Sequence, residues 1–331
     1  MEKQRIAYID AMRGFTMILV VYSHVCWLSL GDVEMGGNRV LLLFRLPCFF
    51  FISGWLFAPV ARRPFWPTVR HKFMVQIVPT TVFLLLLAPP PAFFHQLGTF
   101  KGGYWFTFVL FEFFALYMLS VRCCRRWSWV MALLIAVLAY ALTIYQNELR
   151  SMAVCGWQNA ALDAVGLMSL PLWRYYLFFF FGAVVRQRFT AFVSATDRYW
   201  VLLVSVAGFV ACALLPSEGA AFVGLVRFAV GGLMGVVLVF TVFRRLNISW
   251  RPLQFVGTRT LDIYMLHYFF LPNFLQSWAS HLQAADSLLC ESGVAMAVAI
   301  AVVAVCLAVS YVIRLSPFLG HYLFGAKWPG K

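Results

Sequence analysis

Three ionisable residues interrupt an apolar stretch near the start of the chain, and they are the first candidates for chemistry. Asp10, Arg13 and His24 lie within residues 5–24. An α-helix turns about 100° per residue, so the eleven steps from Arg13 to His24 leave both side chains on one face, roughly 16 Å apart along the axis. Asp10 lies three residues before Arg13, close to the same line. A charge inside a membrane-spanning helix costs about 2.5–3.5 kcal/mol on insertion scales, so this polar line predicts a functional site.

Histidine is the side chain best suited to take up a proton near neutral pH. An anionic substrate that arrives from the cytoplasm would meet Arg13 before it reaches His24. We therefore expect recognition of a donor near Arg13 and chemistry at His24, with the transferred group passed toward an acceptor on the other side. In an alternative interpretation Arg13 is structural and Asp10 is its partner.

Other polar residues break apolar segments further along the chain. Glu112 lies near the middle of one such segment, and His267 lies well inside another. A packed, hydrogen-bonded histidine and a catalytic one are both consistent with the position of His267. Arg45 lies near the outer end of its segment, where snorkelling alone would explain it. Ser53, followed by a glycine, is typical of a close approach between two helices.

A basic cytoplasmic segment runs from Arg62 to Lys72 and includes Arg70. Membrane topology and binding of anionic lipids explain such a patch without any further function. A dock for a phosphorylated cytoplasmic donor is the functional alternative.

The composition fixes the class of protein that carries these residues. The chain of 331 residues is 63% hydrophobic and 11% charged, whereas a soluble domain is about 25% charged. The formal net charge of +14 does not indicate nucleic-acid binding, because the basic residues cluster in short loops between apolar segments. No Cys or His pair has the spacing of a metal site.

The apolar segments predict an all-α, polytopic membrane protein with about ten transmembrane helices. The expected spans are 12–30, 40–61, 72–90, 104–121, 127–145, 171–186, 199–216, 221–243, 260–281 and 293–313. Arg39, Lys101 and Arg150 are the only Lys or Arg residues in the loops on one side. The positive-inside rule therefore places both termini in the cytoplasm. We see no internal repeat and no soluble appendage, and expect one membrane-embedded domain over residues 1–331.

Four motifs, in this order, resemble the integral-membrane acyltransferase family 3 (the OafA/YrhL-like acyltransferases) along nearly the whole chain. The first is a basic residue, ten intervening residues and a histidine, here Arg13 and His24. The second is a Pro-x-Phe-Phe-Phe-Ile-Ser-Gly-like run, here residues 47–54. The third is the Trp-Phe pair that opens a middle span, here at Trp105, and the fourth is a Gly-x-x-Ser/Thr-Leu-x-Ile-Tyr-x-x-His run, here residues 257–267.

The resemblance implies transfer of an acyl group, commonly acetyl, from cytoplasmic acyl-CoA to a hydroxyl of a glycan or another cell-envelope acceptor. It implies that His24 is catalytic, as a general base or a transient acyl carrier, and that Arg13 is required. Asp10, Ser53, Trp105, Glu112 and His267 are possible supporting residues, and Arg45, Arg70 and Lys72 are candidates for donor binding. Many members carry an Arg-x-x-Arg pair before the proline that opens the third span, here Pro79, and this chain has Gln76 in place of the arginine nearer to the proline.

The remaining expectations follow from the same resemblance. Acyl-CoA is a donor substrate, no cofactor or metal is bound permanently, and the partners are the donor, a glycan or lipid-linked acceptor and membrane lipids. The expected location is the bacterial cytoplasmic (inner) membrane. A transporter or flippase, in which the intramembrane charges line a pathway, is the alternative, and a repeat that would favour it is not apparent. An accessory membrane subunit without chemistry is a third possibility.

Overall fold

The computed structural model describes residues 6–88, 92–93, 96, 101–123, 127–152, 168–215, 221–284 and 287–326. Within these ranges the regular elements are all helices and no β-strand occurs. The all-α prediction is therefore confirmed.

Seven helical segments of the described chain are long and apolar enough to cross a membrane, and an eighth results if two helices bent by 100° count as one span. The seven are Ala7–Ser29, Met35–Phe57, Phe65–Leu87, Trp105–Cys123, Ser128–Tyr145, Phe222–Arg245 and Leu288–Arg314. The bent pair is Leu170–Gln187 with Phe189–Thr196. A multi-pass membrane protein is thus confirmed, whereas the count of ten spans is not.

The segment 260–281, predicted as one span, is not one continuous helix. Helix α14 (Thr260–Phe270) ends at Leu271, whose backbone is extended, and helix α15 (Gln276–Ala284) begins only after a short 3-10 turn. Pro272 follows Leu271, and a proline disfavours helical backbone in the residue before it and has no N–H of its own. Eleven residues of α-helix extend over about 16 Å, which is too short for the roughly 30 Å hydrocarbon core.

The chain forms two compact units that interleave along the sequence. The first unit contains residues 1–52, 190–216 and 226–315, and the second contains residues 53–189, 217–225 and 316–331. The expectation of one domain over 1–331 therefore stays a prediction.

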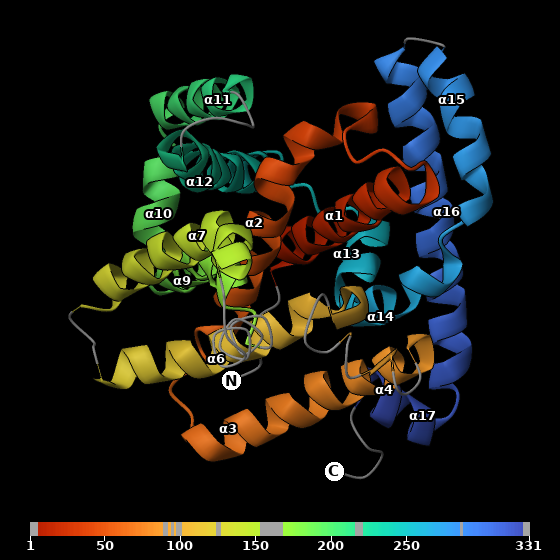
Figure 1. The fold of residues 1–331 in the computed structure, drawn as a ribbon. Helices are drawn as coiled ribbons and strands as arrows, with labels where there is room; N and C mark the ends of the chain where they lie inside the picture. Colours follow the sequence, from red (N-terminus) through yellow and green to blue (C-terminus); the bar gives the residue numbers. More distant parts are fainter. Residues whose placement is uncertain are drawn as a thin grey trace. The chain divides into compact units, whose positions relative to one another are not determined.

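The first unit contains the helices that carry both histidines of interest. They include α1 (Ala7–His24), the first part of α2 (Asn38–Phe57), α11 (Tyr199–Leu214), most of α12 (Ala221–Arg245), α13 (Arg251–Thr258), α14, α15 and α16 (Leu288–Arg314). Figure 1 shows α13 beside α1, and α15 beside α16.

Two glycines allow α1 and α13 to cross at backbone contact. A Cβ on Gly14 would lie 1.9 Å from the carbonyl oxygen of Leu253, and a Cβ on Gly257 would lie 1.9 Å from that of Asp10. Small residues permit this separation between helices in membranes. Gly14 precedes His24 by ten residues, and Gly257 precedes His267 by ten residues. The crossing thus lies the same number of residues before each histidine, although Arg259 separates α13 from α14.

Aromatic packing dominates the second unit. Its helices include α3 (Phe65–Lys72), α4 (Val78–Leu87), α6 (Trp105–Cys123), α7 (Ser128–Met152), α9 (Tyr176–Gln187) and α17 (Pro317–Phe324), the last of which lies beside α4 (Figure 1). The ring of Phe179 contacts those of Phe57 and Phe114. A Cβ on Gly54 would lie 1.9 Å from the carbonyl oxygen of Phe179, so the close approach predicted at Ser53-Gly54 is confirmed.

Candidate active site

His24 is the last residue of α1 and stands at a change of helix type. The next five residues, Val25–Ser29, form a π-helical turn that continues the same span. Such turns are rare and occur frequently at functional sites, because they alter the direction of the side chains next to them. The side chain of His24 is partly accessible, whereas its neighbours Ser23 and Val25 are buried.

His267 of α14 lies directly against His24. Its Nε2 atom is 3.1 Å from Nδ1 of His24, and its Nδ1 atom is 2.8 Å from the carbonyl oxygen of Tyr264 and 3.2 Å from that of Ile263. His267 has no exposed surface. The structure thus brings together two histidines separated by 243 residues, one partly accessible and one fully buried.

Tyr268 completes this cluster. Its hydroxyl is 3.3 Å from Nε2 of His24, and its ring contacts both imidazoles. The sequence analysis did not select Tyr268; its position next to His267 was the only signal available. Below, His24, His267 and Tyr268 are called the histidine cluster.

Arg45 of α2 lies in the same unit as the histidine cluster. Its side chain is 8% exposed and acts electrostatically on His24, Cys26 and Tyr268. A snorkelling arginine would extend its guanidinium to water, so the buried position is against that explanation. The role of Arg45 in donor binding stays a prediction.

Arg13 and Asp10 lie at the other end of α1, near the glycine crossing. Both are partly exposed, and α-helical geometry keeps Arg13 roughly 16 Å from His24 along the axis. Arg13 and His24 therefore share a face of α1, as predicted, but they are too far apart to contact the same small group. The roles of Arg13 and Asp10 stay predictions.

Glu112 and Trp105 lie in the second unit. Oε2 of Glu112 accepts a hydrogen bond of 2.6 Å from the indole N–H of Trp173. Lys101, just before α6, is 1% exposed, and burial lowers its pKa while the carboxylate of Glu112 opposes the change. The ring of Trp105 stacks on that of Tyr175 with centroids 6.2 Å apart. Nothing in these contacts assigns either residue to catalysis.

Ser53, Arg70 and Lys72 also belong to the second unit. Ser53 is next to the Gly54 contact described above, and Arg70 is exposed. The ammonium group of Lys72 lies 4.4 Å from the ring centroid of Phe114, a cation–π contact. Donor binding by Arg70 and Lys72 stays a prediction.

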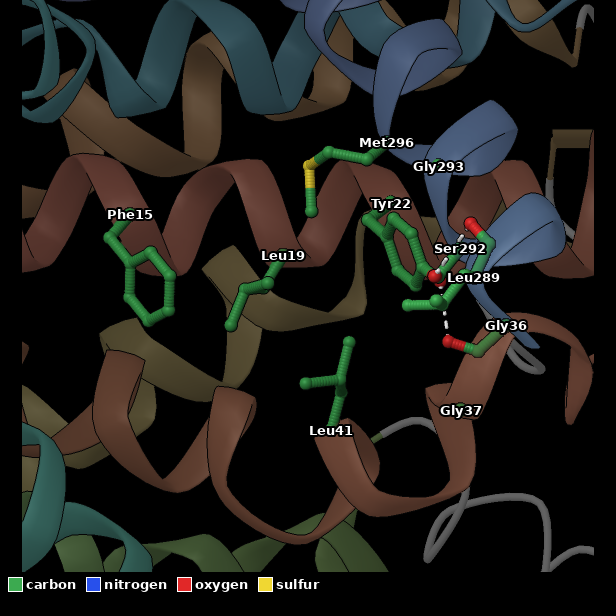
Figure 2. Close-up of a pocket in the computed structure, with 10 residues that line it drawn as sticks. All are labelled: Phe15, Leu19, Tyr22, Gly36, Gly37, Leu41, Leu289, Ser292, Gly293 and Met296. Carbon is green, nitrogen blue, oxygen red and sulfur yellow. Dashed lines mark hydrogen bonds between the residues drawn. The ribbon is translucent and has the colours of Figure 1, made fainter.

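A separate apolar cavity of about 600 Å³ lies along α1 in the first unit. Figure 2 shows Phe15, Leu19 and Tyr22 on its α1 side, and Leu41 and Met296 from α2 and α16. The Tyr22 hydroxyl donates a hydrogen bond of 2.7 Å to the carbonyl oxygen of Gly36 at one end. Tyr22 and His24 are 200° apart around the helix, so the cavity lies on another face of α1 than the histidine cluster.

In the described parts of the chain, no group of three or more His, Cys, Asp or Glu residues could hold a metal ion. The histidine cluster itself contains two imidazoles and a phenol, a set suited to proton transfer.

These features define a multi-pass helical membrane protein with a partly accessible histidine in its first span, held against a buried one. The chain matches the family described as an acyltransferase domain over residues 6–315. It belongs to this family, and the resemblance inferred from the sequence is confirmed. No curated protein and no solved structure matches the chain. The protein is therefore a membrane acyltransferase.

Proposed function

We propose that the protein transfers an acyl group, acetyl in the first instance, from cytoplasmic acyl-CoA to a hydroxyl of a glycan or another cell-envelope acceptor. The membrane that contains it would be the bacterial cytoplasmic membrane. The observation that carries this proposal is the accessible His24, held against the fully buried His267 in a family of acyltransferases.

In the proposed reaction His24 is the general base. It takes the proton of the acceptor hydroxyl while the acceptor oxygen attacks the thioester carbonyl carbon. The carbon–sulfur bond of the resulting tetrahedral intermediate breaks, and the CoA thiolate leaves and takes the proton from His24. The products are the acyl ester and free CoA, so protons and charge balance.

Two arginines have different tasks in this proposal. Arg45, buried and electrostatically coupled to His24, stabilises the negative charge that develops on the thioester oxygen. Arg13, at the cytoplasmic end of α1, binds the phosphorylated part of the donor. Arg13 and His24 are roughly 16 Å apart along α1. A donor extended along α1 can contact both residues, because the pantetheine arm of CoA separates its phosphates from its thioester.

The test is an assay with purified protein, radiolabelled acetyl-CoA and a panel of candidate glycans. Wild type should transfer label, and His24→Ala should lower the rate by about 10²–10⁴-fold, the usual contribution of a general base. His281→Ala is the matched control, because His281 is an exposed histidine of α15 and its loss should leave the rate unchanged. Full activity in His24→Ala would exclude His24 as the base.

Arg13→Ala tests donor binding separately. We expect a higher KM for acetyl-CoA with a smaller change in kcat, since the proposed contact acts on a part of the donor that does not react. An unchanged KM would assign Arg13 to structure, with Asp10 as its partner.

A further inference from the structure

The hydrogen bonds of the histidine cluster have a defined direction. Nδ1 of His267 faces two carbonyl oxygens, those of Tyr264 and Ile263. A carbonyl oxygen only accepts hydrogen bonds, so Nδ1 of His267 carries the proton. In a neutral imidazole the other nitrogen then has a lone pair, and Nε2 of His267 is an acceptor.

Both imidazoles are neutral in the resting state. His267 is fully buried, and a buried charge without a counter-charge is strongly unfavourable. In the described residues no carboxylate hydrogen-bonds to either ring, and the charged group that acts on His24 is Arg45, which has the same sign as an imidazolium. The carboxylate of Asp262, one turn and a half before His267, is bound instead by Ser310 and Arg314.

The tautomer of His24 follows from the tautomer of His267. Because Nε2 of His267 accepts, the 3.1 Å contact requires Nδ1 of His24 to donate. Nε2 of His24 is then unprotonated, and it accepts from the hydroxyl of Tyr268 at 3.3 Å. The hydrogen bonds therefore run in one direction, from Tyr268 through His24 and His267 to the backbone of α14.

We infer that His267 is a positioning residue, which holds His24 as the tautomer with the proton on Nδ1, so that Nε2 of His24 is the atom that takes the proton from the acceptor. The role of Nε2 of His24 in the reaction rests on the proposed function, whereas the tautomer of His24 rests on the hydrogen-bond contacts alone. His267 has no exposed surface and does not touch substrate.

The arrangement also assists His24 once it is protonated. The imidazolium of His24 keeps its Nδ1–H pointed at the lone pair of His267, and a hydrogen bond from a charged donor is stronger than one from a neutral donor. In serine hydrolases a buried aspartate orients the histidine in the same way. Here the orienting group is neutral, and it is itself fixed by two carbonyl groups of its own helix.

Tyr268 occupies the position at Nε2 that an acceptor hydroxyl must take. Its side chain is partly accessible, and the acceptor hydroxyl would replace it at this position.

The experiment is ¹⁵N NMR of the full-length protein in lipid nanodiscs, with labelled histidine. The chain has six histidines, and the signals of His24 are assigned by their loss in His24→Ala. The expected spectrum has a protonated Nδ1 and an unprotonated Nε2 for His24. The opposite tautomer, or a fully protonated ring at neutral pH, would overturn the inference.

Two substitutions of His267 separate positioning from folding. In His267→Gln the side-chain carbonyl oxygen can accept from Nδ1 of His24, whereas His267→Leu of similar volume cannot. We expect the Gln variant to keep the His24 tautomer and most of the activity. The Leu variant should give a mixture of tautomers and a kcat at least about tenfold lower, with KM for acetyl-CoA unchanged.

The outcomes distinguish this inference from the proposed function. The expected tautomer without any acetyl transfer would support the inference and contradict the function. Transfer that depends on His24 but not on the tautomer, with equal kcat in the Gln and Leu variants, would support the function and contradict the inference. If both variants fail to fold, the wild-type spectrum decides the question alone.

Discussion

At the scale of single residues, Glu112 shows why a carboxylate persists inside an apolar helix. The indole N–H of Trp173 donates to it at 2.6 Å, and the buried Lys101 supplies an opposite charge. A buried donor that loses its acceptor costs about 1–3 kcal/mol. These contacts explain Glu112 by the stability of the second unit, and its supporting part in catalysis stays a prediction.

Two substitutions of Glu112 should separate hydrogen bonding from charge. Glu112→Leu leaves the indole of Trp173 without its acceptor and should lower the free energy of unfolding by about 1–3 kcal/mol. Glu112→Gln retains an acceptor oxygen and should cost clearly less. Thermal unfolding in detergent measures both. Equal losses in the two variants would show that the charge next to Lys101, and not the hydrogen bond, stabilises this region.

The site was only partly predictable at this scale. Arg13 and His24 share a face because both are in one helix, and helical periodicity is visible in sequence. The contact between His24 and His267 joins residues 243 positions apart, and no local pattern reports such a distance. Tyr268 was missed for the same reason, since an aromatic residue in an apolar helix is ordinary unless its polar partner is known.

At the scale of elements, the crossing of α1 and α13 sets the geometry of the histidine cluster. Gly14 and Gly257 each face the backbone of the other helix, and each lies ten residues before its histidine. A shift of one helix along the other would therefore displace His267 from His24. The equal spacing was present in the sequence, but its meaning depended on knowing that these two glycines meet.

Gly14→Ala and Gly257→Ala should each destabilise the protein by about 1–3 kcal/mol or more, because the new methyl group would overlap a carbonyl oxygen. Gly293→Ala in α16 is the control. A Cβ there meets no atom within 4 Å, and alanine is favoured over glycine inside a helix by roughly 0.5–1 kcal/mol. Thermal unfolding and acetyl transfer measure the effects. A Gly14→Ala protein as stable and active as Gly293→Ala would show that the helices do not cross so closely.

A buried ion pair fixes α14 to α16. Asp262 is 1% exposed and accepts two hydrogen bonds of 2.7 Å from Arg314, and its carboxylate also accepts from the hydroxyl of Ser310. The main effect of Asp262 is thus on packing between helices, five residues before His267.

Loss of one partner of a buried ion pair lowers the free energy of unfolding by about 3–5 kcal/mol. For Asp262→Asn we expect a loss near the lower end of this range, because Arg314 is partly exposed. Arg314→Gln should also destabilise. The double variant should cost less than the sum of the two, because neither charge is then left alone. Additive losses in thermal unfolding would mean that the two side chains do not interact.

At the scale of the whole molecule, composition predicted a helical membrane protein, and the structure confirms this class. The number of spans was less predictable, because hydropathy does not register where a helix bends or breaks. The apolar segments around residues 171–196 and 260–281 contain a 100° bend and a break at Leu271-Pro272. Pro272 marks the break only after the fact, since Pro47 lies inside α2 without ending it, and no proline lies at the bend between Gln187 and Phe189.

The break after α14 leads to a prediction about topology. If the positive-inside rule is right, Thr258 at the end of α13 lies on the cytoplasmic side. Because α14 is too short to cross alone, the exposed Ser277 in α15 reaches the other side only if α14, the turn and α15 traverse the membrane together. Ser277→Cys should then react with a membrane-impermeant maleimide in intact cells, and Thr258→Cys only after permeabilisation.

The background for this labelling replaces Cys123, Cys124, Cys155 and Cys290 by serine and keeps the four buried cysteines. Labelling of both positions only after permeabilisation would place α14 and α15 in a re-entrant arrangement, with His267 approached from the cytoplasm. In that case the acceptor would have to reach His24 from the donor's side. Labelling of Ser277→Cys in intact cells would instead place the end of this segment opposite the donor, as transfer across the membrane requires.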